Sequence, residues 1–156
     1  MRSVYLDYNA TTPIAPAAQE AMLPFLAEYF GNPSSHHALG RASFEAIEDA
    51  RERVARLLGA ERGDIVFTSG GTESNNLAVV GVALRQAPAG AGHLVISAIE
   101  HPAILEPAKF LESLGFDVTL VQSDSEGVVH PEAVEAAIRD DTFLVSVMHA
   151  NNEIGT

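Results

Sequence analysis

The stretch "DIVFTSGGTESNNLAVVGVAL", residues 64–84, decides the fold expected of this chain. It runs from a short apolar segment through two glycines and several small polar residues into a longer apolar segment. A β-branched run, then glycines, then a run of helical length predicts a buried strand that leads into a helix. The same alternation continues along the rest of the chain. It predicts an α/β fold with a mostly parallel sheet and crossover helices.

Short strand patterns and longer helix patterns follow one another in the sequence. The expected strands are 4–8, 64–68, 93–97, 116–121 and 143–148. The expected helices are about 16–29, 41–58, 72–86, 102–114 and 131–139. Gly59 would be the C-cap of the second of these helices, and Pro102 would lie in the first turn of the fourth. The helix 72–86 is apolar nearly all round and should be buried. No closing helix follows the last strand, so we expect an incomplete large domain, covered by another chain or by residues beyond Thr156.

Composition narrows the class of protein. The chain has 156 residues, 47% of them hydrophobic, which suits a globular domain. Its net charge of −12 argues against a nucleic-acid partner. It has no export signal and no apolar run of about 18 residues, so we expect a cytoplasmic protein with no membrane partner. The absence of cysteine excludes disulfides, thiolate metal sites and a cysteine nucleophile within this chain.

The glycines of the opening stretch suggest a phosphate-binding turn. Gly70 and Gly71 would let the backbone approach an anion, and the first amides of the following helix would face it. The hydroxyl of Thr72 could donate a further hydrogen bond. The pattern is neither that of the P-loop nor that of the dinucleotide-binding turn. The alternative is an ordinary glycine turn with a serine or threonine as helix cap.

Two more polar stretches follow predicted strands. In "SAIEHPAIL", residues 97–105, His101 could present its ring face to a ligand or exchange protons, or simply begin a helix. In "MHANNEIGT", residues 148–156, Asn151 and Asn152 offer amide groups, or simply form a turn. Because parallel strands place their carboxyl ends at one edge of the sheet, we expect all three stretches to converge there.

Two candidate chemistries find no support in the residues. His36 and His37 lie side by side but have no clear third ligand nearby, so we expect no metal site. The single lysine, Lys109, lies beyond the apolar stripe of its helix and is expected to be a solvated surface residue.

The chain resembles the pyridoxal-phosphate-dependent cysteine desulfurases of iron–sulfur cluster assembly, within the class-V aminotransferases. The stretches "YLDYNATTP", "FGNPSSHHALGR", "IVFTSGGTESNNLA", "EHPAIL" and "VSVMHANNEIGT" carry this resemblance. It covers the whole chain but only the first two-fifths or so of a family member. It implies the aminotransferase-like type I fold of a homodimer. Residues 1–14 would form an N-terminal arm or small-domain segment, and residues 15–156 the N-terminal part of the cofactor-binding large domain.

The resemblance also implies roles for particular residues. Gly71 and Thr72 would hold the phosphate of pyridoxal 5′-phosphate. His101 would stack on the pyridine ring and act as a catalytic acid and base. Asn152 would lie near the phenolic oxygen of the cofactor and bind the substrate carboxylate. His37 matches a family histidine to which we assign no chemistry.

The implied reaction converts L-cysteine to L-alanine and an enzyme-bound persulfide, from which a scaffold protein would accept sulfur. The "NNEIGT" form favours iron–sulfur cluster assembly over the selenocysteine lyase branch. The family's Schiff-base lysine, pyridine-facing aspartate, persulfide cysteine and carboxylate-binding arginine do not occur here, so we expect the chain alone to be inactive. The alternatives are a non-catalytic module that binds phosphate or the cofactor, and, on topology alone, a nucleotide-binding domain.

Overall fold

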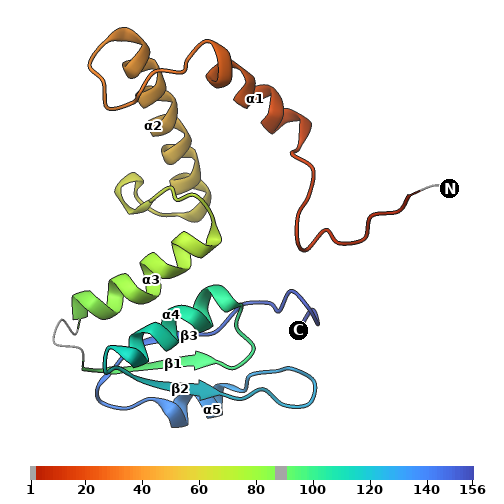
Figure 1. Cartoon of the computed structure of the whole chain (residues 1–156), viewed down its shortest axis with the longest axis vertical. Helices are drawn as coiled ribbons and strands as arrows, with labels where there is room; N and C mark the ends of the chain where they lie inside the picture. The colour runs from red at the N-terminus through yellow and green to blue at the C-terminus, as the bar shows by residue number, and fades with distance from the viewer. Residues whose placement is uncertain (1–2, 87–90) are drawn as a thin grey trace. The chain divides into compact units, whose positions relative to one another are not determined.

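The computed structural model describes residues 3–86 and 91–156 (Figure 1). The chain divides into two compact units, Met1–Phe67 and Thr68–Thr156. Among the described residues, no helix combines the length and the apolar character needed to cross a membrane.

The second unit is built on a parallel sheet of three strands. The strands are β1 (His93–Ser97), β2 (Asp117–Val121) and β3 (Thr142–Ser146), in the order β2-β1-β3. The helices are α3 (Gly71–Gln86), α4 (Pro102–Ser113) and α5 (Pro131–Ala137). The chain passes through α4 between β1 and β2, and through α5 between β2 and β3. The expected α/β fold with crossover helices is therefore confirmed.

The core of this unit lies between the central strand and the helices that pack on it. All five residues of β1 are buried, as expected for a strand with neighbours on both edges and helices on both sides (Figure 1). Leu94 and Ile96 of β1 pack in one apolar cluster with Ile104 and Leu111 of α4. This packing fixes α4 against the sheet, and with it the turn that begins α4.

Two of the expected strands do not form, and one expected helix is less buried than the sequence predicts. Residues 4–8 and 64–68 are not strands. No described strand pairs with either segment, and an extended segment without a hydrogen-bonded neighbour does not form a sheet. In α3 only Val79 and Ala83 are buried, while Leu77 is 54% exposed. The apolar pattern of this helix therefore indicates a surface that the described residues leave uncovered on one side.

The first unit contains α1 (Pro16–Ala27), α2 (Ala38–Leu58) and a short 3₁₀ helix at Arg62–Asp64. The helix α2 ends at Gly59, whose φ of 66° lies in the left-handed region, so the expected C-cap is confirmed. It begins three residues before the expected position of 41. The reason is that Nδ1 of His37 accepts a hydrogen bond from the Gly40 N–H at 3.2 Å and caps the helix.

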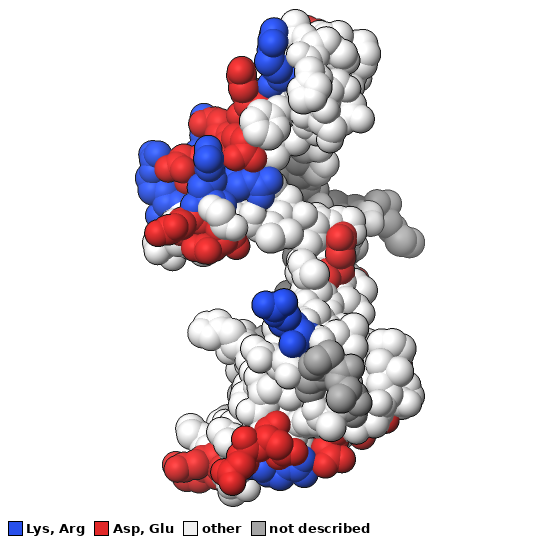
Figure 2. Space-filling model, turned by 90° about the vertical axis from the view of Figure 1, so that its left-hand side faces the viewer, with Lys and Arg blue, Asp and Glu red and all other residues white. Residues whose placement is uncertain are grey.

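The exposed side of α2 is covered by ion pairs one helical turn apart (Figure 2). Arg53 pairs with Asp49 at 2.6 Å, and Arg56 pairs with Glu52 at 3.4 Å. Such pairs support a helix by a few tenths of a kcal/mol each, about 0.3–0.5 kcal/mol. The ion pairs on this face therefore add a small amount to the stability of the helix.

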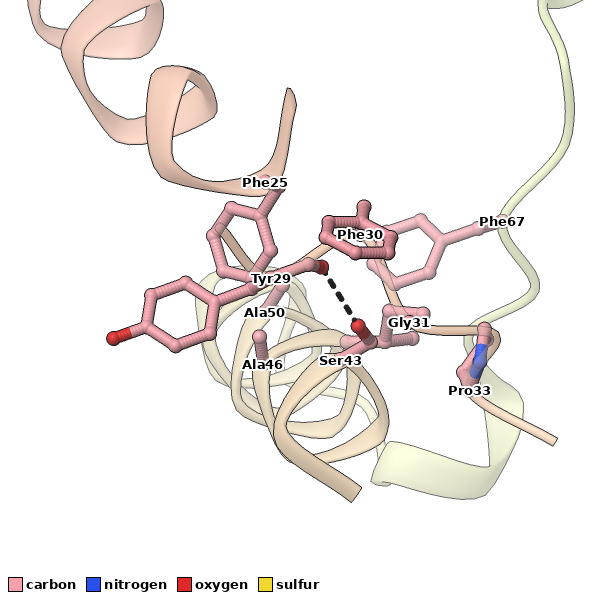
Figure 3. Close-up of a pocket in the computed structure, with 10 residues that line it drawn as sticks. Phe25, Tyr29, Phe30, Gly31, Pro33, Ser43, Ala46, Ala50 and Phe67 are labelled. Carbon is pink, nitrogen blue, oxygen red and sulfur yellow. Dashed lines mark hydrogen bonds between the residues drawn. The ribbon is translucent and has the colours of Figure 1, made fainter. Parts of the chain in front are cut away.

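The same unit holds an apolar hollow of about 450 Å³ (Figure 3). Its aromatic walls come from Phe25, Tyr29, Phe30 and Phe67. The Ser43 hydroxyl donates a hydrogen bond, shown as a dashed line in Figure 3, to the Tyr29 carbonyl oxygen at 2.9 Å. None of the site residues expected from the sequence lines this hollow.

Candidate functional site

The first candidate site element is the N-terminus of α3. The helix begins at Gly71, and the Ser74 N–H donates to the Gly70 carbonyl oxygen at 3.1 Å. The amides of the first turn have no acceptor within a helix. Gly70, Gly71 and Thr72 are exposed. Apart from adjoining residues and the backbone of the helix itself, no described atom lies within 4 Å of the position a Cβ would take at either glycine. The turn is therefore open to an anion.

The backbone conformation at Gly70 and Gly71 does not require glycine. Neither Gly70 nor Gly71 has a positive φ, so the sharp left-handed turn that glycine would permit is not used. What the two residues provide is the open space beside the backbone. A ligand can therefore approach these amides more closely than side chains would allow.

A set of hydrogen bonds within the turn holds it in shape. The Glu73 carboxylate accepts from the Ser69 N–H at 2.6 Å and from the Ser69 hydroxyl at 2.5 Å. The hydroxyls of Thr68 and Ser74 lie 2.6 Å apart, within hydrogen-bonding distance. The bonds from Ser69 hold the pKa of Glu73 below its ordinary value. Glu73 is therefore ionised at neutral pH, and its partner is Ser69, which precedes the open amides.

The second element is the N-terminus of α4. His101 is the N-cap, and its Nδ1 accepts a hydrogen bond from the Ala103 N–H at 3.0 Å. Pro102 occupies the first helical position, as expected from the sequence. A neutral imidazole that accepts at Nδ1 carries its hydrogen on Nε2. The ring is exposed, so Nε2 is the atom through which His101 could exchange a proton.

These two elements meet at one hollow of about 440 Å³. Thr72 and Asn76 line it from α3, and His101, Glu106 and Phe110 line it from the α4 side. A hydroxyl, the N-terminal ends of two helices and a flat imidazole are a donor set that suits an anionic group attached to an aromatic ring. The structure thus brings Thr72 and His101 together, with Gly71 next to Thr72 in the chain.

Asn152 does not line this hollow. Its Nδ2 donates to Glu153 Oε1 at 3.0 Å. The loop that carries it is nevertheless tied to the His101 loop, because Asn151 Nδ2 donates to the Ile99 carbonyl oxygen at 3.0 Å. The loops after β1 and β3 are therefore neighbours, as parallel pairing of the two strands requires.

Lys109 lies where the sequence analysis places it. Its Nζ pairs with Glu106 Oε1 at 2.7 Å, and its side chain is 65% exposed. It is not among the residues that line the hollow. The prediction of a surface lysine is confirmed.

The sequence analysis did not identify Asn76, Glu106 and Phe110 in the wall of the hollow, or Glu73 in the turn. A carboxylate three residues after the Gly70 position is a helix-start signal that could have pointed to Glu73. The wall residues lie on helix faces that no local pattern distinguishes. They become neighbours only because α3 packs on α4.

The parallel sheet, its crossover helices and the hollow between two helix N-termini define an α/β protein. Residues 4–156 match the family described as aminotransferase class-V. The chain belongs to this family.

Curated relatives are similar to the chain along nearly its whole length. It is 56% identical over 155 residues to the cysteine desulfurase IscS of Dictyoglomus turgidum, covering 99% of this chain and 39% of that protein. It is 51% identical to cysteine desulfurase IscS 1 of Archaeoglobus fulgidus, covering 97% of this chain and 40% of that protein. The chain therefore spans about two-fifths of the length of the curated relatives it matches.

Solved structures agree with this similarity. A structure described as SspA in complex with cysteine matches with a TM-score of 0.92 and 44% identity, covering 97% of this chain and 43% of that chain. A NifS-like protein matches with a TM-score of 0.89 and 42% identity, covering 95% and 40% of the two chains. These similarities do not favour the alternative of a non-catalytic binding or assembly module.

Proposed function

We propose that this chain is the N-terminal, cofactor-binding part of a pyridoxal-phosphate-dependent cysteine desulfurase. The proposal rests on one observation above all, that Thr72 and His101 line one hollow at the N-termini of two helices. Similarity to proteins named cysteine desulfurase supports the activity, and the neighbour in complex with cysteine supports L-cysteine as substrate.

The residues of the α3 turn fit the phosphate of the cofactor. The open amides of Gly71 and Thr72, together with the Thr72 hydroxyl, would donate to the phosphate oxygens. The carboxylate of Glu73 would stay on Ser69, as it does here, so that it does not take up these amides. Bound pyridoxal 5′-phosphate would supply an electron sink for bond changes in an amino acid.

His101 would act on both the ring and the proton. Its imidazole would stack on the pyridine ring, held in place by the bond that Nδ1 accepts from the Ala103 N–H. Nε2 would then take up and return a proton during the conversion of L-cysteine to L-alanine. Asn152 would direct its carboxamide to the phenolic oxygen of the cofactor and to the substrate carboxylate.

Other parts of the proposal concern the assembled enzyme. A lysine and a cysteine from the remaining part of the enzyme would hold the cofactor covalently and carry the sulfur as a persulfide. The assembled enzyme would act as a cytoplasmic homodimer and pass sulfur to a scaffold protein for iron–sulfur clusters. The name IscS borne by the relatives supports this role.

The phosphate-binding turn can be tested with Thr72→Val, which keeps the side-chain shape and removes the hydroxyl. We expect pyridoxal 5′-phosphate to bind the chain about tenfold more weakly, because one hydrogen bond to a charged group is lost. Titration followed by the NMR amide signals of Gly71 and Thr72 measures this. Thr11→Val, an exposed threonine in the first unit, is the matched control. Equal affinity of Thr72→Val and the unchanged chain would contradict the assignment.

A further inference from the structure

Asn151 makes hydrogen bonds with both the nitrogen and the oxygen of its carboxamide. Its Nδ2 donates to the Ile99 carbonyl oxygen at 3.0 Å, across 52 residues of sequence. Its Oδ1 accepts from the Glu153 N–H at 2.8 Å and from the Ile154 N–H at 3.1 Å. One half-buried carboxamide thus shapes its own loop with its oxygen and contacts another loop with its nitrogen.

The contact lies beyond the end of the sheet. Pairing between β1 and β3 ends at Ile96 and Ser146, so the ladder does not fix the loops that follow the two strands. The loop after β3 also closes on itself, because the Asn151 N–H donates to the Thr156 carbonyl oxygen at 2.8 Å. The same loop is also attached to the residues after β2, because the Thr156 hydroxyl donates to the Glu126 carbonyl oxygen at 3.1 Å. The bond from Asn151 to Ile99 is the attachment that joins it to the loop leading to His101.

We propose that Asn151 is a positioning residue, which holds Asn152 beside His101 by tying the loop after β3 to the Ile99 carbonyl. This inference rests on the proposed function, in which Asn152 and His101 contact the same cofactor. Ile99 lies two residues before His101, and Asn151 comes directly before Asn152. The two adjacent asparagines therefore divide the work, one fixing the loop and the other binding the ligand.

The variant Asn151→Ser distinguishes the role of the Asn151 side-chain oxygen from that of its nitrogen. A serine hydroxyl can still accept from the amides that follow it in a turn, but it is too short to reach Ile99. We expect the Glu153 and Ile154 amides to stay protected from hydrogen exchange. The NMR signals of the His101 ring and the Asn152 carboxamide should shift. Asn151→Ala should lose both the protection and the tie.

A matched control is Asn32→Ser. Asn32 Oδ1 accepts from the Ser34 N–H at 2.9 Å within its own loop, so the same chemical change breaks no contact between loops. Its substitution should leave the His101 and Asn152 signals in place. Unchanged His101 and Asn152 signals in Asn151→Ser would overturn the proposal, whether or not the cofactor binds.

The affinity for pyridoxal 5′-phosphate is a second measurement, which substitution of a residue with a purely structural role would not change. We expect Asn151→Ser to weaken binding about five- to tenfold. In a double-mutant cycle, adding Asn151→Ser to Asn152→Ala should weaken binding no further, since a positioning residue acts through the residue it places. Additive losses would overturn the proposal. If the unchanged chain does not bind the cofactor, the proposed function fails, and the NMR comparison alone then decides the role of Asn151.

Discussion

His37 and His101 perform the same local task in different units of the chain. Each imidazole accepts, at Nδ1, a hydrogen bond from an amide of the helix that follows, Gly40 or Ala103. This task is usually given to serine, threonine, aspartate or asparagine. A histidine that begins a helix brings a ring and a second nitrogen to the same position. At His101 this places the residue in the lining of the hollow.

The two roles of His101 can be separated by substitution. We expect His101→Ala to lower the free energy of unfolding by about 1 kcal/mol, because the cap is lost. His101→Asn should retain most of that stability, since asparagine is a good N-cap. Both variants should bind pyridoxal 5′-phosphate more weakly than the unchanged chain. Urea unfolding and a cofactor titration measure the two effects. Full affinity in His101→Asn would show that the ring does not contact the cofactor.

For single residues, the sequence predicts the roles that depend only on immediate neighbours in the chain. Gly59 as a C-cap and Pro102 in a first turn follow from local backbone geometry, and both are confirmed. The tie from Asn151 to Ile99 could not be predicted, because it joins residues 52 positions apart. A carboxamide in "HANNEIGT" suits a turn equally well in either of the two asparagine positions.

Among the elements, the central strand β1 is held to both neighbours by one side chain. His93 is fully buried. Its Nδ1 lies 2.8 Å from the Thr142 hydroxyl of β3, and its Nε2 lies 2.8 Å from the Thr119 hydroxyl of β2. Both ring nitrogens therefore have partners at the end of the sheet opposite the candidate site. Burial lowers the pKa of His93 and the charge of Arg139 lowers it further, while Asp141 and Asp117 oppose the shift.

The direction of this shift predicts how stability depends on pH. Because the pKa of His93 in the folded chain lies below the ordinary value of 6.5, the unfolded chain binds that proton more tightly. The contribution of His93 to the free energy of unfolding is therefore complete above about pH 6.5 and is lost as the pH falls toward the folded pKa. The slope cannot exceed about 1.4 kcal/mol per pH unit.

The variant His93→Gln tests this expectation, since glutamine keeps polar groups near both threonines and does not titrate. Urea unfolding between about pH 5 and pH 8, followed by the NMR amides of Leu94 and Ile96, should show a smaller loss of stability at low pH than in the unchanged chain. His36→Gln, at an exposed histidine, should keep the original slope. If His93→Gln keeps it too, another group is responsible.

Element prediction succeeded where the described chain supplies the packing that the sequence implies. The strands expected at 93–97, 116–121 and 143–148 are found within one or two residues, and they pair with one another. The segments 4–8 and 64–68 have equally good strand patterns but no partner among the described residues. The amino-acid pattern of a segment indicates that it prefers burial and an extended backbone. A β-strand also needs a neighbouring strand with which to form hydrogen bonds.

At the scale of the whole molecule, the chain carries much exposed apolar surface. Leu57 and Leu58 on α2 are 84% and 67% exposed, and Leu120 and Val145 on the outer strands are 49% and 41% exposed. Apolar side chains that are this exposed are available for contact with other polypeptide. This agrees with the proposed place of the chain within a larger enzyme.

The proposed division of residues between this chain and the rest of the enzyme predicts where activity is found. The chain contains no cysteine to accept sulfur, and its only lysine is paired with Glu106 at 2.7 Å on an exposed helix surface. We therefore expect the purified chain to release no alanine from L-cysteine in the presence of pyridoxal 5′-phosphate. Alanine should appear when the chain is combined with the part of the Dictyoglomus turgidum relative that lies beyond the matched 39%.

The variant Lys109→Arg shows whether the lysine of this chain takes part in that reaction. Arginine keeps the positive charge and the ion pair but has no reactive amine, so the combined sample should release alanine at an unchanged rate. His101→Ala in the same mixture should abolish most of the release, because it removes the proposed acid and base. Loss of activity in Lys109→Arg, or alanine formed by the chain alone, would mean that the reactive amine lies within these residues and that the proposed division is wrong.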